Sequence, residues 1–490
     1  MMMREEKDYT NLLRRYDQAK ERRGVWENTW QECYDYSLPQ RGNFTASQMP
    51  GRIRTDRLYD GTALDAVDQL AASLLGHLTP PWTQWFGFKP GPDLSAQEAQ
   101  ALAPVLEESA KIIQAHFDRS NFCVEMHQCF LDLVVGGTAA LYFEEAEPGA
   151  FSAFKFTAVP LSDIVLEEGA GGYLDGSFRE MEMTLAQIAD RYPSADIPAD
   201  VAREGERDPQ ARFKVLESIL PEGGTYQYTA ILKDRNAVEP LAAGTFPMSP
   251  CIAFRWMKSP GELYGRSPVM KALPDIKTAN KVVELILKNA SIAVTGIWQA
   301  DDDGVLNPAN IQLVPGAIIP KAVGSQGLKP LEMPGRFDVS QIILDDIRAR
   351  IRHALLIDKL GQLEGRRMTA TEVVERASEM ALLLGATYGR LQTELLTPMI
   401  RRAYAILRRR GEIPDIALDG RFVALDYRAP LARAQAQRNV QNTMTWLTSL
   451  IGMGGDAAAF IDMNRAAQFL GEALGVPSDL IRKDLSDAAL

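Results

Sequence analysis

The chain has 490 residues, of which 53 are Lys or Arg and 64 are Asp or Glu, so its formal net charge at neutral pH is −11. At roughly 150 residues per domain this length corresponds to about three domains, and 46% hydrophobic with 24% charged residues is a globular composition. The acidic balance excludes a protein that coats nucleic acid by neutralising its phosphates, but not one that surrounds DNA without binding it tightly.

Cysteine and histidine are too few and too scattered for a disulfide framework. The four cysteines include no CxxC pair, so we expect synthesis in a reducing compartment. Cys123, His127 and Cys129 lie close together. Two interpretations stay open: a zinc ligand set without a fourth ligand at finger spacing, or a half-buried amphipathic helix, which we favour. We expect no metal and no cofactor.

The sequence predicts neither a targeting segment nor a membrane segment. The N-terminus has no apolar stretch of the kind found in secretory signals. The longest nearly apolar run, residues 130–143, contains Asp132 and two glycines and is shorter than the ~20 residues that span a bilayer. We therefore expect a soluble protein that is made in the cytoplasm.

The first 140 residues are predicted to be mostly helical. An apolar stripe at three- and four-residue steps predicts a helix from about Leu12 to Leu38, which Pro39 ends. Three further amphipathic segments predict helices at 63–78, 96–117 and 124–135.

From about residue 140 to 260 the apolar period changes to two, which is typical of half-buried strands. We expect a mixed α+β region here. The predicted strands lie around Phe154 and Phe156, at 226–232 and at 252–256, with turns at 169–172, 221–224 and 247–250 where glycine and proline cluster.

Two long helices are predicted on either side of a short irregular segment. Ser267-Pro268 has the pattern of a helix start, and the helix continues to about Ala293 with an expected break at Pro274. Residues 294–335 predict a small compact excursion. A second helix is predicted over 338–359, supported by an ion pair between Asp346 and Arg350 four residues apart.

A glycine-bracketed loop at 361–368 and an unusually long helix follow. Thr369 and Glu372 form a capping box, and the helix that they open can continue past Arg410. If straight it would be about 60 Å long, but Pro398 predicts a kink. A strand over 421–430 and alanine-rich helices from Arg433 onward complete the predicted elements.

The sequence contains no catalytic constellation that we recognise. It has no P-loop, no HExxH, no GxSxG and no GxGxxG at the start of a βαβ unit. Asp301, Asp302 and Asp303 are either a solvated acidic turn, which we favour, or ligands for Mg²⁺. We therefore expect a protein that is not an enzyme. A metal-dependent nucleic-acid-processing enzyme and a helical scaffold or adaptor without a channel stay open as alternatives.

Five segments, in their order and spacing, carry a family resemblance. They are the helix that contains Trp26, Trp30 and Cys33, LAASLLGHLTPPWTQWF at 70–86, LVVGGTAALYF at 133–143, YGRSP at 264–268 and GRRMTATEVVERASEM at 365–380. Together they resemble the head-to-tail connector, or portal, proteins of T7-like short-tailed bacteriophages. The chain is somewhat short for that family.

The resemblance implies a predominantly helical α+β subunit of a ring, usually a dodecamer, at one vertex of the capsid in a virion. Double-stranded DNA would be packaged and later ejected through its channel. The implied parts are a wing (1–265, β-rich over 140–260), stem helices (266–293 and 336–360), a clip (294–335), a tunnel loop (361–368), a long channel-lining helix (369–412), a return to the wing (413–435) and a crown (436–490).

The resemblance also implies partners. The terminase large subunit and tail adaptor or nozzle proteins would dock at the clip, where Asp301, Asp302 and Asp303 lie. The ring would contact major capsid and scaffolding proteins and no membrane, and the protein would be made in the host cytoplasm.

Basic residues of the long-helix region are the implied DNA contacts. The tunnel loop would place Gln362, Glu364, Arg366 and Arg367 at the channel, where the arginines would touch phosphates without reading bases. The alternative is a solvent-exposed turn before a helix. Arg376, Arg401 and Arg402 are further channel-lining candidates, although Arg401, Arg402 and Arg408 to Arg410 also suit a helix C-terminus as ordinary surface charge.

An aromatic cluster, Trp82, Trp85 and Phe86, follows the second predicted helix. Aromatic side chains can stack on the bases of single-stranded nucleic acid, whereas a packaging channel holds duplex. We therefore interpret the cluster as core or as a contact between subunits.

Overall fold

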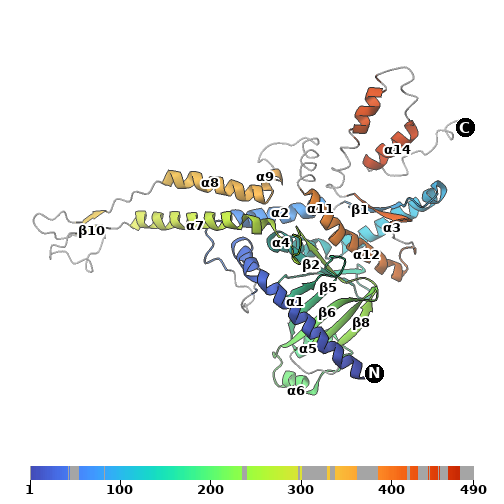
Figure 1. The fold of residues 1–490 in the computed structure, drawn as a ribbon, viewed down its shortest axis with the longest axis horizontal. Coiled ribbons are helices and arrows are strands. Elements are labelled where there is room, and N and C mark those ends of the chain that lie inside the picture. Colours follow the sequence, from blue (N-terminus) through green and yellow to red (C-terminus); the bar gives the residue numbers. More distant parts are fainter. Residues whose placement is uncertain are drawn as a thin grey trace, which may run out of the picture.

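Two β-sheets with their covering helices form a body from which a long helical hairpin projects (Figure 1). The computed structural model describes residues 2–41, 44, 54–81, 83–233, 240–295, 298–300, 328–330, 337–360, 384–415, 420–428, 440, 442–450, 452 and 462–474. The four predicted N-terminal helices are confirmed as α1 (Met2–Ser37), α2 (Thr62–Leu78), α3 (Ala96–Arg119) and α4 (Phe122–Gly136).

The predicted β-rich region forms two antiparallel sheets. The outer sheet has five strands in the order β4-β5-β6-β7-β8, and the inner sheet has three in the order β3-β2-β9. Gly223 and Gly224, with φ of 57° and 86°, make the tight turn between β6 and β7 that the sequence predicts. The strands are β2 (Thr138–Glu145), β3 (Phe154–Val159), β4 (Ile164–Glu167), β5 (Gly176–Met183), β6 (Phe213–Glu222), β7 (Thr225–Leu232), β8 (Ala242–Phe246) and β9 (Cys251–Arg255).

Both faces of the outer sheet are covered. Helix α1 packs on one face, where Tyr16 lies edge-on to Phe178 with 5.7 Å between ring centres. Arg23 fixes the helix there, because its buried guanidinium donates to the carbonyls of Ser162 and Ile164 at 2.9 Å each. The short helices α5 (Leu185–Arg191) and α6 (Ala199–Arg207) lie between β5 and β6 in the chain and pack on the other face.

The projecting hairpin consists of α7 (Pro268–Thr295) and α8 (Phe337–Ala354). The sequence predicts a small compact excursion at its far end. There β10 (Trp298–Ala300) pairs antiparallel with β11 (Leu328–Pro330) (Figure 1). Asp301, Asp302 and Asp303 lie outside the described residues.

The start of α7 is confirmed, but the expected break at Pro274 is wrong. The Ser267 hydroxyl accepts a hydrogen bond from the Met270 N–H at 2.8 Å, which is the N-cap contact. The helix then runs through Pro274 without interruption. Leu273 and Ile276 on either side are buried in the core, and this packing offsets the roughly 3 kcal/mol that an interior proline costs a helix.

The second predicted helix is split instead of continuous. Helix α8 ends at Ala354 and α9 (Ile357–Leu360) begins after Leu356, whose φ is 61°. A left-handed leucine costs about 1–2 kcal/mol, and here the turn lets the flanking Leu355 and Ile357 both reach the core. The predicted pair with Asp346 is also wrong, because Arg350 instead contacts Asp275 on α7.

The predicted kink near Pro398 is present as a π turn. It joins α11 (Gly385–Leu391) to α12 (Thr397–Arg410) through η2 (Gln392–Leu396), where the Thr397 N–H reaches back five residues to the Gln392 carbonyl. Pro398 has no N–H to offer the Glu394 carbonyl four residues earlier, and the wider turn accommodates this loss. The part of the long helix before residue 384 lies outside the described residues.

The predicted strand near residue 425 is confirmed as β12 (Val423–Tyr427), but its partner β1 (Phe86–Pro90) was not expected. The aromatic run around β1 does not alternate with polar residues, so its period gave no strand signal. Trp85 and Phe86 are buried against Phe117, which confirms them as core; Trp82 lies outside the described residues. Helical residues 442–450 and α14 (Met463–Leu474) agree with the predicted C-terminal helices.

No helix within the described ranges is long and apolar enough to cross a membrane.

Helix α4 has the half-buried character predicted for the segment with Cys123 and Cys129. Cys129 is buried and its thiol donates to the Ala140 carbonyl at 3.5 Å, whereas Cys123 is only partly covered.

Two glycines from distant motifs touch at the base of the hairpin. Gly137 ends α4 with φ of 77°, and a Cβ on it would lie 2.3 Å from the Gly265 carbonyl oxygen. A Cβ on Gly265 would lie 2.2 Å from the Gly137 oxygen. The Gly265 N–H donates to Thr138 Oγ1 at 2.8 Å, so no side chain can be accommodated between the two segments.

We expect Gly137→Ala to lower the free energy of unfolding by roughly 3–5 kcal/mol, because left-handed strain adds to a backbone clash. Gly149→Ala is the matched control: its φ is 93° but nothing lies within 4 Å of its Cβ, so strain alone should cost about 1–2 kcal/mol. Urea unfolding of both variants measures the difference. Equal losses would show that the contact with Gly265 contributes nothing.

Candidate functional site

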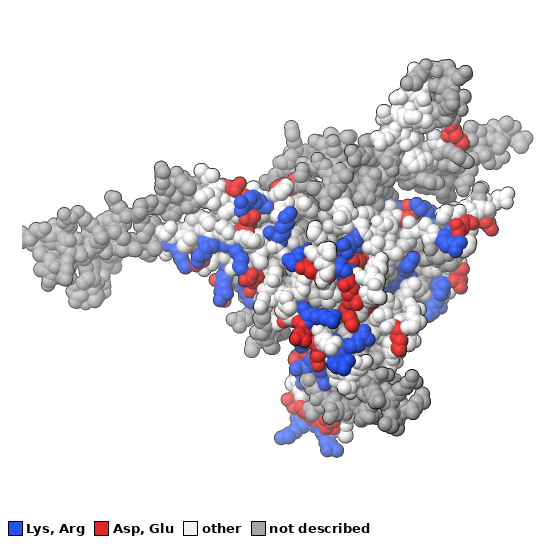
Figure 2. Space-filling view, viewed as in Figure 1, with Lys and Arg blue, Asp and Glu red and all other residues white. Residues whose placement is uncertain are grey.

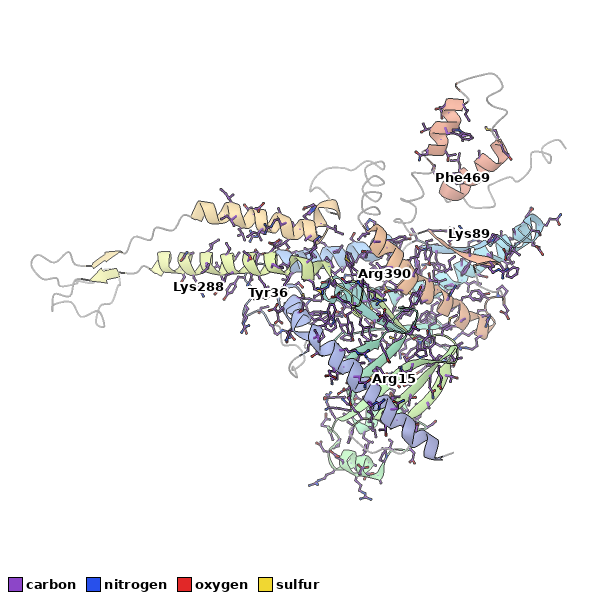
Figure 3. All side chains as sticks on the ribbon, in the orientation of Figure 1. Arg15, Tyr36, Lys89, Lys288, Arg390 and Phe469 are labelled. Atoms are coloured by element: carbon purple, nitrogen blue, oxygen red, sulfur yellow. The ribbon has the colours of Figure 1, made fainter. Side chains whose placement is uncertain are left out.

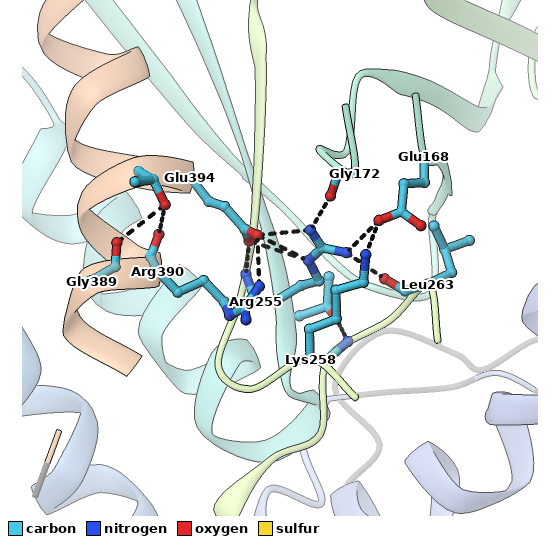
Figure 4. Close-up of polar contacts among 11 residues, drawn as sticks. Glu168, Gly172, Arg255, Lys258, Leu263, Gly389, Arg390 and Glu394 are labelled. Carbon is cyan, nitrogen blue, oxygen red and sulfur yellow. Dashed lines mark hydrogen bonds and ion pairs between the residues drawn. The ribbon is translucent and has the colours of Figure 1, made fainter. Parts of the chain in front are cut away.

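A buried ion pair joins the end of β9 to the π turn of the kinked helix (Figure 4). Arg255, the last residue of β9, is 0% exposed and Glu394 in η2 is 7% exposed. The Arg255 Nη2 donates to Glu394 Oε1 at 2.7 Å, and its main-chain N–H donates to Oε2 at 2.9 Å. Side chain and backbone of one residue therefore hold both oxygens of the same carboxylate.

The remaining donors of Arg255 bind the loops on its other side. Nη2 donates to the Gly172 carbonyl at 2.8 Å and Nη1 to the Leu263 carbonyl at 3.0 Å. Glu168 lies 3.4 Å from Nη1 and also contacts Lys258. Burial opposes the charge on Glu168, but its hydrogen bonds and its attraction to Lys258, and then to Arg255, lower its pKa overall. The guanidinium thus connects β9 with three other segments: the loop at 168–172, the loop that contains Leu263, and η2.

A second arginine also contacts Glu394. Arg390, one turn earlier, donates to Glu394 Oε1 at 3.2 Å and is partly exposed. Removing two ions from water costs several kcal/mol each, and such a pair is retained only when its geometry satisfies the groups it buries. The contacts of Arg255 meet that condition, so separating the π turn from β9 would leave an unpaired buried charge.

The kink itself brings Glu394 to β9. Because Pro398 disrupts the regular α-helical ladder, the helix widens to a π turn over residues 392–396, and Glu394 lies within it. The helix arm before this turn, α11, begins directly after residues 361–383, which lie outside the described residues. The ion pair therefore fixes the described part of the helix that follows the predicted tunnel loop.

The hairpin has its own polar anchor. On α7, Asn280 Oδ1 accepts from the N–H groups of Tyr59 and Asp60 at 2.6 and 3.1 Å. On α8, Arg348 forms an ion pair with the buried carboxylate of Asp60 at 2.7 Å. Both helices are therefore bound to one short segment before α2, which limits their movement relative to each other.

Most of the predicted DNA-contact residues lie outside the described residues, namely Gln362, Glu364, Arg366, Arg367 and Arg376. Arg401 is exposed on α12 and stays a predicted channel residue.

Arg402 departs from the expectation. It is 7% exposed, and its guanidinium donates to the carbonyls of Phe143 and Met248 at 2.6 and 2.8 Å. Burial, with repulsion from Arg409, lowers its pKa to about 10. A guanidinium enclosed by its own subunit has no surface to offer DNA, so the structure contradicts the interpretation of Arg402 as a channel-lining residue.

The arginines at the end of α12 pair within the chain. Arg409 contacts Glu145 at 2.5 Å and Arg410 contacts Glu412 at 2.7 Å, while Arg408 contacts Asp415 at 2.9 Å. These contacts favour the interpretation of the triplet as ordinary surface charge near a helix C-terminus.

Sequence reasoning missed Arg255 and Glu394. The signal was present, because Arg255 follows an apolar strand, CIAF, and Glu394 stands beside leucines one turn before a proline. Charged residues are rarely buried unless they are paired, so both positions required partners. The sequence does not show which residue is the partner of which, because the two positions are 139 apart.

Comparison with known proteins places nearly the whole chain in one family. The family model described as bacteriophage head to tail connecting protein matches residues 9–481. A probable portal protein of Bordetella phage BPP-1 is 24% identical over 507 residues, which cover 98% of this chain and 90% of the relative. The portal protein of Escherichia phage T7 is 25% identical, covering 82% of this chain and 75% of the relative.

A third relative and two solved structures extend the comparison. The portal protein of Salmonella phage epsilon15 is 24% identical and covers 97% of this chain and 89% of the relative. A chain in the virion of a native gene transfer agent particle matches with a TM-score of 0.37 and 14% identity, covering 84% of this chain and 90% of that one. A chain in the neck of the same kind of particle, computed with C12 symmetry, matches with a TM-score of 0.32 and 14% identity, covering 81% and 99%. These TM-scores are too low to support an inference.

We expect Glu394→Ala to destabilise the chain by about 3–5 kcal/mol, because it leaves the Arg255 guanidinium buried without its carboxylate. The double variant Arg255→Met with Glu394→Leu removes both charges and should lose less than the sum of the single variants Arg255→Met and Glu394→Leu. Urea unfolding of the wild-type protein, the single variants Arg255→Met and Glu394→Leu, and the double variant measures the coupling between the two side chains. The same measurement on Glu394→Ala gives the loss for the unpaired arginine. Additive losses would mean that the two side chains do not act as a pair.

Proposed function

The chain belongs to the bacteriophage head-to-tail connecting protein family, and we propose that it is the portal subunit of its phage. Identical copies form a ring, usually of twelve, around a channel at one capsid vertex, and double-stranded DNA is packaged and later ejected through it. The observation that carries this proposal is the family match over residues 9–481, supported by the relatives named portal protein.

The shape of the described chain supports the assignment of parts. The hairpin of α7 and α8 with β10 and β11 at its tip suits a stem that ends in a clip (Figure 1). The sheets and α1 suit a wing, the kinked helix suits a channel lining, and the described C-terminal helices, 442–450 and α14, suit part of a crown.

Apolar side chains on the hairpin support self-association. Leu287 on α7 is 53% exposed, and Ile342 and Ile343 on α8 are 71% and 50% exposed. One copy of the hairpin does not cover these three side chains. Exposed apolar side chains that gather on one projecting hairpin are typical of an interface. Packing of neighbouring copies around the ring would remove them from water.

The charge distribution supports a channel through which DNA slides. On the face shown in Figure 2, Lys and Arg are interspersed with Asp and Glu, without a broad basic area among the described residues. One of these cations, Lys288, lies on the side of α7 away from α8 (Figure 3). An acidic subunit repels the phosphate backbone, so only a few loop cations would meet the duplex.

The proposed subunit is not an enzyme, and the work of packaging belongs to its partners. The terminase large subunit would supply the energy and would dock at the clip near Asp301, Asp302 and Asp303, where tail adaptor or nozzle proteins later bind. Major capsid and scaffolding proteins would surround the ring in the virion. Synthesis would take place in the host cytoplasm, without membrane contact.

Negative-stain electron microscopy of the purified full-length chain tests the proposal. We expect closed rings with a central hole, because head-to-tail contacts between identical subunits close when the rotation per subunit divides a full turn. A strictly monomeric particle across the range of concentrations used for assembly would overturn the proposal.

Replacing Arg366 and Arg367 by alanine should leave ring assembly intact and lower the amount of DNA packaged or retained, because the proposed contacts to phosphate would be lost. Packaging assays with the variant ring measure the effect. Arg409→Ala is the matched control, since its partner is Glu145 in the same chain, and it should package normally. Failure of the double variant to assemble would mark the loop as an interface between subunits.

A further inference from the structure

Four buried polar atoms without a hydrogen-bonding partner in the described chain belong to residues of the inner and outer sheets that lie close together. They are the Tyr142 hydroxyl on β2, Ser177 Oγ and Arg179 Nε on β5, and Glu217 Oε2 on β6. Tyr142, Ser177 and Glu217 are 3%, 2% and 0% exposed. Buried polar atoms in folded proteins nearly always have a partner, so a group of four at one place requires an explanation.

Sheet register brings the four atoms together. Arg179 lies directly opposite Glu217 in the ladder between β5 and β6, and Ser177 is two residues away on the same face. From the other sheet Tyr142 approaches, with its ring centre 5.4 Å from the Arg179 guanidinium carbon. Cys251, opposite Tyr142 on β9, completes the inner-sheet side of the site.

The electrostatic influences agree with this placement. Burial raises the pKa of Tyr142 well above its usual value, and Cys251 and Glu217 raise it further. Burial also raises the pKa of Cys251 to about 11, against the opposing effect of Ser177. Ser177 thus lies close enough to Tyr142 and Cys251 for its hydroxyl to lower the pKa of both in the manner of a hydrogen bond, although neither contact has the distance and angle of a formed one.

The carboxylate of Glu217 is held through one of its two oxygens. Its Oε1 accepts hydrogen bonds from the hydroxyls of Tyr192 and Tyr228 at 2.7 and 2.9 Å and from Arg191 Nη2 at 2.8 Å. These three donors fix the orientation of the group. Oε2 has no donor in the described chain.

The chemistry of the four atoms selects the occupant. Arg179 Nε–H needs an acceptor and Glu217 Oε2 needs a donor, whereas the hydroxyls of Tyr142 and Ser177 can do either. An anion would be repelled by Glu217 and a cation by Arg179. A neutral molecule that both donates and accepts satisfies all four, and water is the smallest such molecule.

We propose that internal water is bound between the two sheets of the wing, bridging Tyr142 and Ser177 to Arg179 and Glu217. This site goes beyond the proposed portal role and does not depend on it. Its consequence concerns β9, which has Cys251 beside the site and Arg255 at its other end. Water that fixes β2 and β9 to the outer sheet also fixes the strand that holds Glu394 and the kinked helix.

The sign of one stability change tests the site. If water binds the Tyr142 hydroxyl, Tyr142→Phe removes a hydrogen bond and should lower the melting temperature of the full-length protein by about 2 °C or more. If the hydroxyl has no partner, its removal relieves an unsatisfied buried group, and the melting temperature stays the same or rises. The second outcome would overturn the proposal. Ser177→Ala provides a second variant with the same two expectations.

Two other tyrosines calibrate the measurement. The Tyr264 hydroxyl accepts from the Leu166 N–H at 3.2 Å, so Tyr264→Phe gives the loss for a known buried hydrogen bond. Tyr173 is 51% exposed, so Tyr173→Phe should change nothing. Tyr142→Phe should resemble the first control; resemblance to the second would count against the water.

A density map of the full-length protein that shows ordered water gives an independent test. We expect a peak about 2.6–3.2 Å from both Tyr142 Oη and Glu217 Oε2. The absence of a peak, or a peak with cation-like oxygen distances of about 2.3–2.6 Å, would overturn the assignment to water.

Discussion

A charge removed from water must be paired, and the pairing of Arg255 with Glu394 constrains the rest of the structure. The two residues are 139 positions apart, yet each carboxylate oxygen of Glu394 accepts from Arg255. Because an unpaired ion in this place is costly, the kinked helix cannot leave β9 unless water enters. The carbonyls of Gly172 and Leu263 extend the same constraint to two loops, so the helix and the wing behave as one body at this point.

Close packing adds to the polar contacts that hold the base of the hairpin. Three of the five residues YGRSP make a separate contact here: Tyr264 packs edge-on against Trp30, with 4.9 Å between ring centres, Gly265 lies against Gly137, and Ser267 caps α7. Leu263, which accepts from Arg255, immediately precedes them. A change in the direction of α7 would therefore disturb the same region that holds the kinked helix, and this shared base gives a physical route between the two.

Sequence patterns predicted the elements whose signals are local. The helices of the first 140 residues, the N-cap at Ser267, the hairpin turn at Gly223-Gly224 and the kink near Pro398 follow from period, capping and backbone chemistry. The failures have a different cause. Pro274 stays helical because Leu273 and Ile276 are buried, Arg350 pairs with Asp275 on another helix, and β1 is defined by its partner β12. Each failure depends on contacts between distant residues, which no window of sequence contains. The family resemblance supplied what local patterns did not, namely the family to which the chain belongs.

The net charge has a different meaning once the partners of the arginines are known. Counted along the sequence, 53 basic residues appear available to bind phosphates despite the acidic excess. In the folded chain many arginines are occupied by their own subunit: Arg23 and Arg402 bind carbonyls, while Arg41, Arg255, Arg348 and Arg428 pair with carboxylates. Their charges stabilise the fold at close range and contribute little to a surface that would hold DNA. Because these arginines are bound within the subunit, the protein offers fewer cations to phosphates than its sequence count suggests, which lowers its non-specific attraction to DNA.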